Sequence, residues 1–131
     1  MWVRSPPRVW QRLAPVDRQS RKGQQVIARL WHGWTRSADA DAYEALLRRE
    51  IFPAIAGKGI AGYRGIDLLR RAGTDAVEFV TIMWFDSWDA VRDFAGPDMD
   101  AAVVPAPARA LLQRFDERSA HYEVIERVAG Q

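Results

Sequence analysis

Two histidine residues, His32 and His121, are the side chains of this chain best suited to acid–base catalysis. An unperturbed imidazole titrates near about pH 6.5, so a neutral histidine can accept a proton from a phenol or an activated carbon. His32 is near the end of the first predicted strand and His121 near the start of the last, so antiparallel pairing would bring both to one end of a sheet. The sequence does not fix the pairing register, and therefore not the face of either side chain. Each could instead be half-buried and only hydrogen-bonded.

Aromatic side chains near the predicted strand ends could line a flat pocket for a small aromatic molecule. The candidate substrate-binding residues are Trp31, Trp34, Tyr63, Arg64, Trp84 and Phe115. Arg64 could stabilise an enolate or phenolate anion through its positive charge. Alternatively, the tryptophans pack in the core or at a subunit contact, and Arg64 is a solvated residue on an edge strand.

Hydrophobic periodicity predicts the elements that must position these residues. The predicted strands are 26–34, 63–71, 76–85 and 119–127, and the AGTD turn at 72–75 joins the second and third as a hairpin. Three helices are predicted. The first is capped by Ser37, kinked by Pro53 and ended by Gly57. The second is capped by Ser87 and runs through Phe94, and a short third helix spans 108–115.

This order predicts an α+β, ferredoxin-like βαββαβ fold, with a four-stranded antiparallel sheet and the helices on one face. Both faces of the strands are apolar, however. In the third strand Val77, Phe79, Met83 and Phe85 alternate with Val80, Ile82 and Trp84. An apolar face left in contact with water would lose several kcal/mol of hydrophobic stabilisation, at roughly 25 cal/mol per Å² of apolar surface. We therefore predict a homodimer in which a second copy covers that face.

Composition excludes several classes of function. The 131 residues include no cysteine, so disulfides, thiolate metal sites and thiol nucleophiles are impossible. Two histidines without a fixed carboxylate partner are a weak metal pattern, and we predict neither a metal nor a cofactor. No apolar run approaches the roughly 18 residues of a membrane span, and no signal peptide is apparent, so we expect a cytoplasmic protein without a membrane partner.

The net charge of +2 is unevenly distributed. Residues 1–24 hold six basic residues and one acid, whereas the remainder is mildly acidic. Because a nucleic-acid platform needs a basic folded surface, no nucleic-acid partner is expected. Residues 1–24 also lack a sustained hydrophobic periodicity of either a strand or a helix. We interpret them as a basic, disordered or weakly helical tail that precedes a domain at 25–128. Two alternatives stay open: the natural protein starts near Val26, or these residues are an organelle transit peptide.

Four stretches carry a resemblance to a known family. VIARLWHGW (26–34), EIFPAIAG (50–57), IAGYRGIDLLRR (60–71) and VEFVTIMWFDSWDAVRDFAG (77–96) resemble the antibiotic biosynthesis monooxygenase superfamily. The resemblance covers about residues 26–127 and implies a dimeric α+β barrel. It further implies oxidation of polycyclic aromatic substrates by O2 without metal or flavin, or haem degradation. The haem-degrading branch uses an asparagine and a histidine on the second helix, and this chain has neither.

The resulting hypothesis is a cofactor-independent monooxygenase that oxidises a small aromatic or polyketide-type substrate after His121 or His32 removes its acidic proton. A non-redox isomerase or cyclase on the same scaffold is the second hypothesis, and a ligand-binding dimer without catalysis is the third. An RNA-recognition fold shares the element order, but its aromatic third-strand signature is absent.

Overall fold

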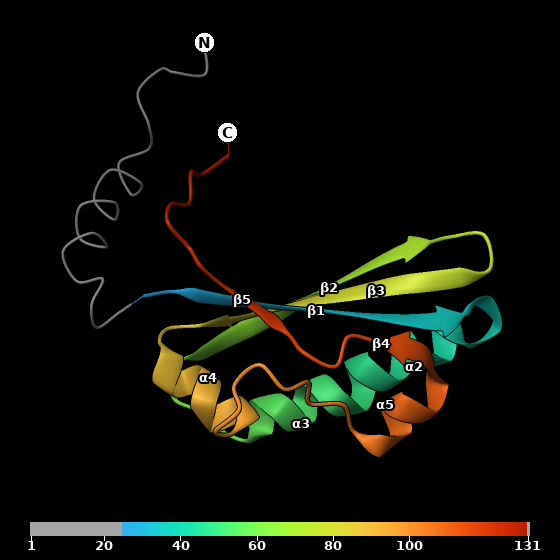
Figure 1. Cartoon of the computed structure of the whole chain (residues 1–131), viewed down its shortest axis with the longest axis horizontal. Helices are drawn as coiled ribbons and strands as arrows, with labels where there is room; N and C mark the ends of the chain where they lie inside the picture. Colours follow the sequence, from blue (N-terminus) through green and yellow to red (C-terminus); the bar gives the residue numbers. More distant parts are fainter. Residues whose placement is uncertain (1–24, 131) are drawn as a thin grey trace, which may run out of the picture.

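A computed structural model describes residues 25–130, which form one antiparallel sheet with the helices on one of its faces (Figure 1). The strands are β1 (Ile27–Arg36), β2 (Tyr63–Ala72), β3 (Ala76–Phe85), β4 (Leu112–Phe115) and β5 (Ala120–Glu123). The helical segments are η1 (Ser37–Asp39), α2 (Ala40–Leu46), η2 (Leu47–Ile51), α3 (Phe52–Gly57), α4 (Trp88–Ala95) and α5 (Ala106–Leu111). Among these segments, none is both long and apolar enough to cross a membrane. The tail predicted for residues 1–24 lies outside the described residues.

The sheet has the order β2-β3-β1-β4, and β5 also pairs with β1. All of these pairings are antiparallel. β4 lies opposite the C-terminal half of β1 and β5 opposite its N-terminal half, so two short strands share the edge position predicted for one. The predicted ferredoxin-like α+β fold is therefore confirmed.

The prediction of a helix at 108–115 is wrong over its second half. Helix α5 ends at Leu111, and Leu112–Phe115 is strand β4. A short apolar run fits either structure locally, and here the free edge of β1 supplies backbone partners that favour the strand. The last strand is also shorter than predicted, because β5 spans only Ala120–Glu123.

The two predicted helix caps have different outcomes. Ser87 caps α4 as predicted, since its side chain accepts a hydrogen bond from the Ala90 amide at 3.1 Å. Ser37 instead begins the 3-10 turn η1, whose N-cap position is Arg36 without a side-chain hydrogen bond. Where the sequence predicts a kink at Pro53, the structure has the π-helical turn η2 just before it. Proline provides no amide donor to continue the regular ladder.

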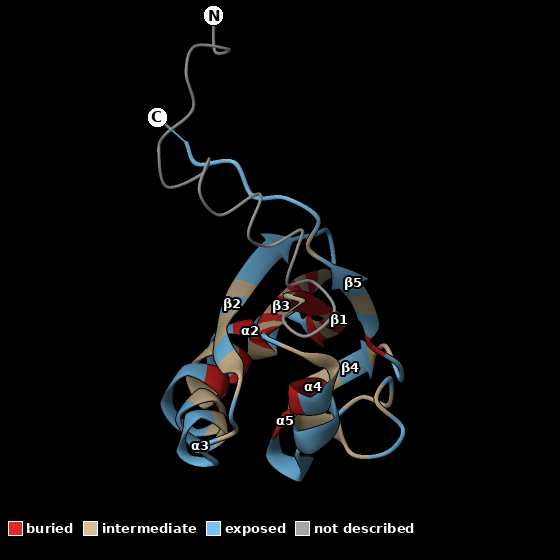
Figure 2. Cartoon of the chain, turned by 90° about the vertical axis from the view of Figure 1, so that its left-hand side faces the viewer, coloured by how far each residue is buried: buried red, intermediate tan, exposed pale blue. Residues whose placement is uncertain are grey.

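The sheet has a helix face and an outer face. On β3, the side chains of Val77, Phe79, Met83 and Phe85 are buried against the helices, while Val80, Ile82 and Trp84 on the outer face are half-buried. Figure 2 shows the buried residues gathered between sheet and helices. The C-terminal segment after β5 rises from the opposite side of the sheet (Figure 1). The alternation of apolar residues on both faces, expected from the sequence, is confirmed.

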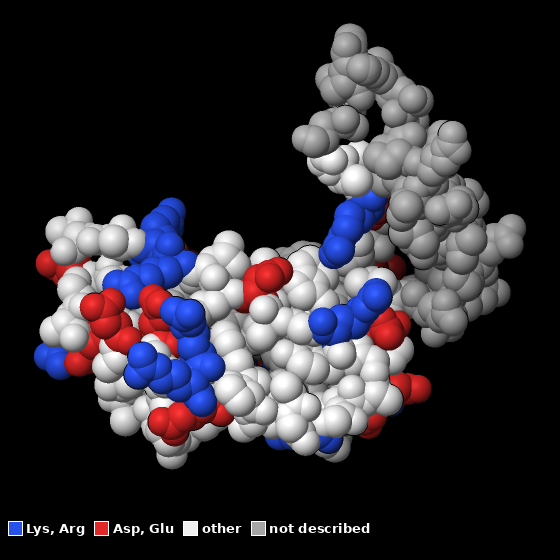
Figure 3. Space-filling view, turned by 180° about the vertical axis from the view of Figure 1, so that it is seen from behind, with Lys and Arg blue, Asp and Glu red and all other residues white. Residues whose placement is uncertain are grey.

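Charged side chains on the surface are largely paired. Arg70 contacts Asp41 at 3.0 Å and Glu44 at 2.7 Å, which joins β2 to α2. On the face in Figure 3, basic and acidic groups lie side by side at the left-hand end, and uncharged surface separates them from those on the right. Charge on this face is thus mixed in sign.

Candidate active site

A small cavity lies between the helix face of the sheet and the helices, and we call it the inner cavity. Its apolar walls include Leu47, Ile55, Ile66, Met83, Phe94 and Val104. Its polar lining comes from Arg29, Trp31, Thr81 and Ser119. The volume is about 60 Å³, less than the roughly 150 Å³ of an engineered cavity that binds benzene. An aromatic ligand therefore enters only if a wall moves, and Val103–Pro105, which precede α5, form the wall without regular structure.

Arg29 is the charged residue of the inner cavity. It shares the helix face of β1 with Ile27 and Trp31, and only 3% of its surface is exposed. Its Nη1 donates hydrogen bonds to the Met99 carbonyl and to His121, and its Nη2 donates to the Ala101 carbonyl at 2.8 Å. The guanidinium thereby ties the segment between α4 and α5 to the sheet.

His121 is held between Asp100 and Arg29. Its Nδ1 lies 2.9 Å from Asp100 Oδ1, and its Nε2 lies 3.0 Å from Arg29 Nη1. A carboxylate can only accept and a guanidinium can only donate, so a neutral ring with its proton on Nδ1 satisfies both neighbours. Burial, helped by the charge of Arg29 and opposed by Asp100, lowers the pKa of His121 below its usual value. At neutral pH this imidazole is therefore an uncharged base.

The lowered pKa of His121 predicts how stability changes with pH. The unfolded chain holds a proton on this ring more tightly, so the ring contributes fully to stability above about pH 6.5, and that contribution is lost as the pH falls toward the folded pKa. We expect the Tm to fall between about pH 7.5 and about pH 5.5, and to fall less in His121→Gln. Thermal denaturation followed by circular dichroism measures both. Equal losses in the two proteins would contradict this origin.

The structure does not bring the two histidines together, contrary to the expectation from the sequence. His121 pairs with Arg29 and shares its helix face, whereas His32 lies three residues further along β1 and points to the outer face. There His32 Nδ1 is 2.8 Å from Glu78 Oε2, and the ring stacks on Trp34. The hydrogen bond from His32, with a second contact from Arg71, lowers the pKa of the Glu78 carboxyl.

Three of the predicted binding residues lie on the helix face. Trp31 lines the inner cavity, packs near Phe115 and donates from Nε1 to the Asp116 carbonyl at 2.8 Å. Its ring covers Gly33, where an added Cβ would lie 2.6 Å from the ring, so only glycine leaves room for it. Tyr63 packs on Phe85, and burial raises the pKa of its phenol.

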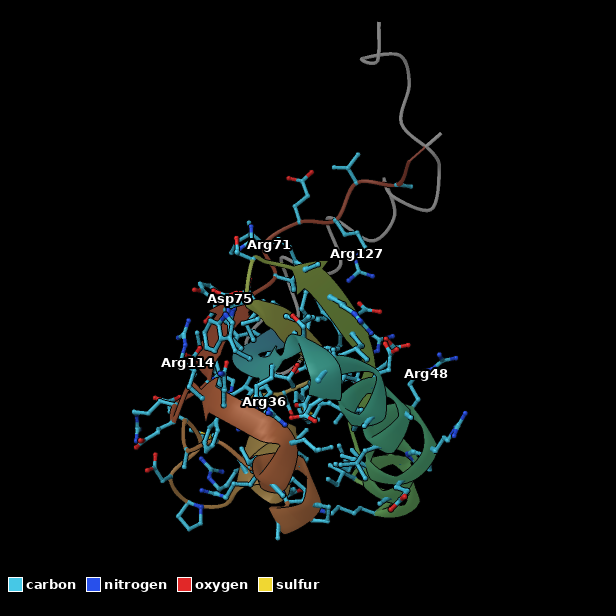
Figure 4. All side chains as sticks on the ribbon, turned by 90° about the vertical axis from the view of Figure 1, so that its right-hand side faces the viewer. Arg36, Arg48, Arg71, Asp75, Arg114 and Arg127 are labelled. Carbon is cyan, nitrogen blue, oxygen red and sulfur yellow. The ribbon has the colours of Figure 1, made fainter. Side chains whose placement is uncertain are left out.

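The other three predicted binding residues do not lie on the helix face, and of all six only Trp31 lines the inner cavity. Trp34 and Trp84 are on the outer face, where Trp34 is covered by Arg114, with 3.7 Å between the guanidinium carbon and the ring centroid. Trp84 donates from Nε1 to Asp67 at 3.0 Å and is approached by Arg127. Arg127, like Arg71, lies on the side of the sheet away from the helices (Figure 4). Arg64 is exposed and paired with Asp86, so its charge is already balanced.

Sequence reasoning missed Arg29, Ser119 and Asp100 as site residues. The signal for Arg29 was available, because it interrupts the buried face of β1 between Ile27 and Trp31. Ser119 and Asp100 carried no such signal, since their place depends on how the segment between α4 and β5 folds over the sheet. Within residues 25–130, no group of three or more histidine, aspartate or glutamate side chains is placed to hold a metal ion.

Comparison with known proteins relates the chain to others only through its structure. No protein-family model and no curated protein matches the chain. The fold is similar to the crystal structure of a protein from Bacillus cereus that is named as a proposed antibiotic biosynthesis monooxygenase. The TM-score is 0.56 at 14% sequence identity, over 81% of this chain and 99% of that one. At this identity, the likeness shows a shared fold alone.

Proposed function

We propose that this chain is a cofactor-independent monooxygenase-like protein, which oxidises a small aromatic or polyketide-type substrate with O2 at the inner cavity. The observation that carries the proposal is the neutral His121, fixed in one tautomer by Asp100 and linked to the cavity through Arg29. A base of this kind can remove an acidic proton from a carbon beside a carbonyl or phenol. The fold is compatible with this choice, since a protein named as a proposed antibiotic biosynthesis monooxygenase has a similar one.

The reaction needs no redox group from the protein, because the deprotonated substrate supplies the electrons. Loss of one proton from a CH2 group to His121 Nε2 leaves a carbanion, which passes one electron to O2. The resulting radical and superoxide combine to a peroxide. Loss of water then converts CH2 into C=O, so that one O2 gives one carbonyl and one H2O. The chain contributes the base, the exclusion of water by the apolar walls and the placement of the substrate.

We also propose that the protein acts as a homodimer, with the outer faces of two sheets packed together. Leu30, Val80 and Ile82 form an apolar strip on the outer face, and none of the helices within residues 25–130 covers it. Leu69 at its edge is 46% exposed, and Tyr122 on β5 is more exposed still. A second copy presents the same apolar strip, so a twofold contact would bury both strips at once.

Oxygen consumption with anthrone as substrate tests the proposed activity. In chelator-treated buffer without flavin, we expect the wild-type protein to consume O2 and form anthraquinone. We expect His121→Ala to lose roughly 100-fold or more of this rate, the usual contribution of a positioned base. His32→Gln is the matched control, since it removes the other imidazole from the outer face and should keep the rate. Equal rates in His121→Ala and the wild-type protein would rule out the proposed role of His121.

One observation favours a second candidate, ligand binding without turnover. In this structure Nε2 of His121 already accepts a hydrogen bond from Arg29, so the lone pair that a base needs is occupied. A binding protein would retain anthrone without raising its oxidation above the rate in buffer alone. The same oxygen measurement therefore separates the two candidates.

A further inference from the structure

The inner cavity contains a buried positive charge without a direct counter-ion. Among residues 25–130, no carboxylate oxygen lies within 4.0 Å of the Arg29 guanidinium. The nearest charge partner, Asp100, acts on Arg29 across the His121 ring. Burial accordingly lowers the pKa of Arg29 to about 10, even though Asp100 opposes the shift. A buried charge of this kind lowers the stability of the fold unless an anionic group pairs with it.

Apart from its contact with the Phe94 ring, 5.4 Å from the guanidinium carbon to the ring centroid, the structural role of Arg29 does not require this charge. Its bonds to the carbonyls of Met99 and Ala101 could be made by a neutral donor such as a glutamine amide. These two bonds and the bond to His121 use three N–H donors, while the Nε–H group has no partner among the described residues. The guanidinium thus retains donor capacity beside an apolar cavity.

Ser119 is the second polar group without a partner at this place. It is only 6% exposed and lines the inner cavity, and its Oγ has no hydrogen bond in the described part of the chain. Its backbone N–H donates a hydrogen bond to the Asp100 carbonyl at 2.6 Å, so the side-chain hydroxyl is the donor that remains for a ligand. Buried polar groups in proteins nearly always have a partner. A buried hydroxyl without a partner, in the same cavity as a cation without a direct counter-ion, indicates that a ligand supplies the missing hydrogen bond.

We propose that Arg29 and Ser119 bind the anionic oxygen of a small apolar acid, whose body packs against Ile66, Met83 and Phe94. Both side chains would donate to this oxygen, and the charge of Arg29 would be balanced. The inference rests on the proposed function for the location of the site, and it adds the ligand class: an acid bound in its ionised form. When the ligand oxygen takes the Nη1–H of Arg29, Nε2 of His121 is released to act as a base.

Nuclear magnetic resonance titration under argon tests this binding without turnover. The probes are three acids of increasing size: propionate, benzoate, and 4-nitrophenolate at about pH 8.5. Benzoate and 4-nitrophenolate enter only if a wall of the cavity moves. Propionamide and benzamide are the neutral controls. We expect saturable shifts of the Arg29 Nε–H and Ser119 amide signals with at least one acid, and binding about tenfold or more weaker for the amides. The two carboxylates and the phenolate show which kind of anionic oxygen the site takes. If no acid binds saturably, the inference is wrong.

A matched pair of variants separates binding from general effects of burial. Ser119→Ala and Thr35→Val each remove a buried hydroxyl without a partner, but only Ser119 lines the inner cavity. We expect Ser119→Ala to raise the Kd of the bound acid about tenfold, and Thr35→Val to leave it unchanged. Arg29→Met should abolish binding, and its circular dichroism spectrum reports whether it folds. Unchanged affinity in a folded Ser119→Ala protein would overturn the role of Ser119.

The binding and oxidation experiments can fail independently. Acid binding without anthrone oxidation would leave the anion site standing and reject the oxygenase. Anthrone oxidation without acid binding would reject the anion site and leave the oxygenase standing.

Discussion

The Ile82→Lys variant is expected to run as a monomer at about 10 µM, a concentration at which the wild-type protein is expected to be a dimer. Ile82 lies in the middle of the outer face, opposite Leu30 of β1 and Asp67 of β2. In a twofold sheet-to-sheet contact the change would bury two ammonium groups at once, one from each copy. Asp67 lies opposite each ammonium, but the cost of taking these charges out of water between two packed sheets should still raise the dimer Kd by roughly a hundredfold or more. Size-exclusion chromatography with light scattering measures the mass of both proteins.

The control for this variant is Ala42→Lys, which adds the same charge to an exposed position on α2, behind the sheet. It should remain a dimer. A wild-type protein that is monomeric at this concentration would contradict the proposed dimer and the two-layer barrel that depends on it. A dimeric Ile82→Lys protein would show that the copies associate through another surface.

Replacing Phe85 by alanine is expected to lower the free energy of unfolding by about 3–5 kcal/mol. Phe85 is fully buried at the end of β3, where it packs between Tyr63 and Phe94. The surrounding helix and strands cannot close the space that the ring leaves, so the lost contacts add to the lost transfer free energy. Urea denaturation at fixed protein concentration measures the change.

The control for Phe85→Ala is Leu69→Ala on the outer face. Leu69 is partly exposed, so its truncation should cost less than about 1 kcal/mol in the monomer. A similar loss in both variants would mean that the core does not lie on the helix face. Because the proposed dimer adds its own stability, both variants are to be compared at a concentration where the wild-type protein is monomeric.

Local features of the fold followed from local features of the sequence. The alternation through Ala76–Phe85 predicted β3 with its bounds, because a strand turns each successive side chain to the other face. The turn that follows Ala72 and the cap at Ser87 depend on neighbouring residues alone, and both were predicted correctly. The same reasoning failed at Leu112–Phe115, where the choice between helix and strand was made by β1, a distant segment.

The candidate site depended on contacts between distant segments. The sequence placed His32 and His121 on the first and last strands, but only the register between β1 and β5 decides that they face opposite sides. That register is set by which side chains pack against the helices, and no local pattern contains it. Burial, helped by the charge of Arg29, lowers the pKa of His121, and Asp100 fixes its Nδ1 side; these two partners are 92 and 21 positions away in the chain.

The sequence by itself determined the order of the elements as far as α5, the two apolar faces of the sheet and the small set of residues able to do acid–base chemistry. These follow from periodicity and composition, which any short window of the chain displays. The tertiary structure alone decided that Arg29 and Ser119 line one cavity, that His121 contacts Arg29, and that His32, Trp34 and Trp84 lie on the other face of the sheet. The reason is physical: burial and a missing counter-ion are properties of the space between elements, and that space exists only after the sheet and helices have packed.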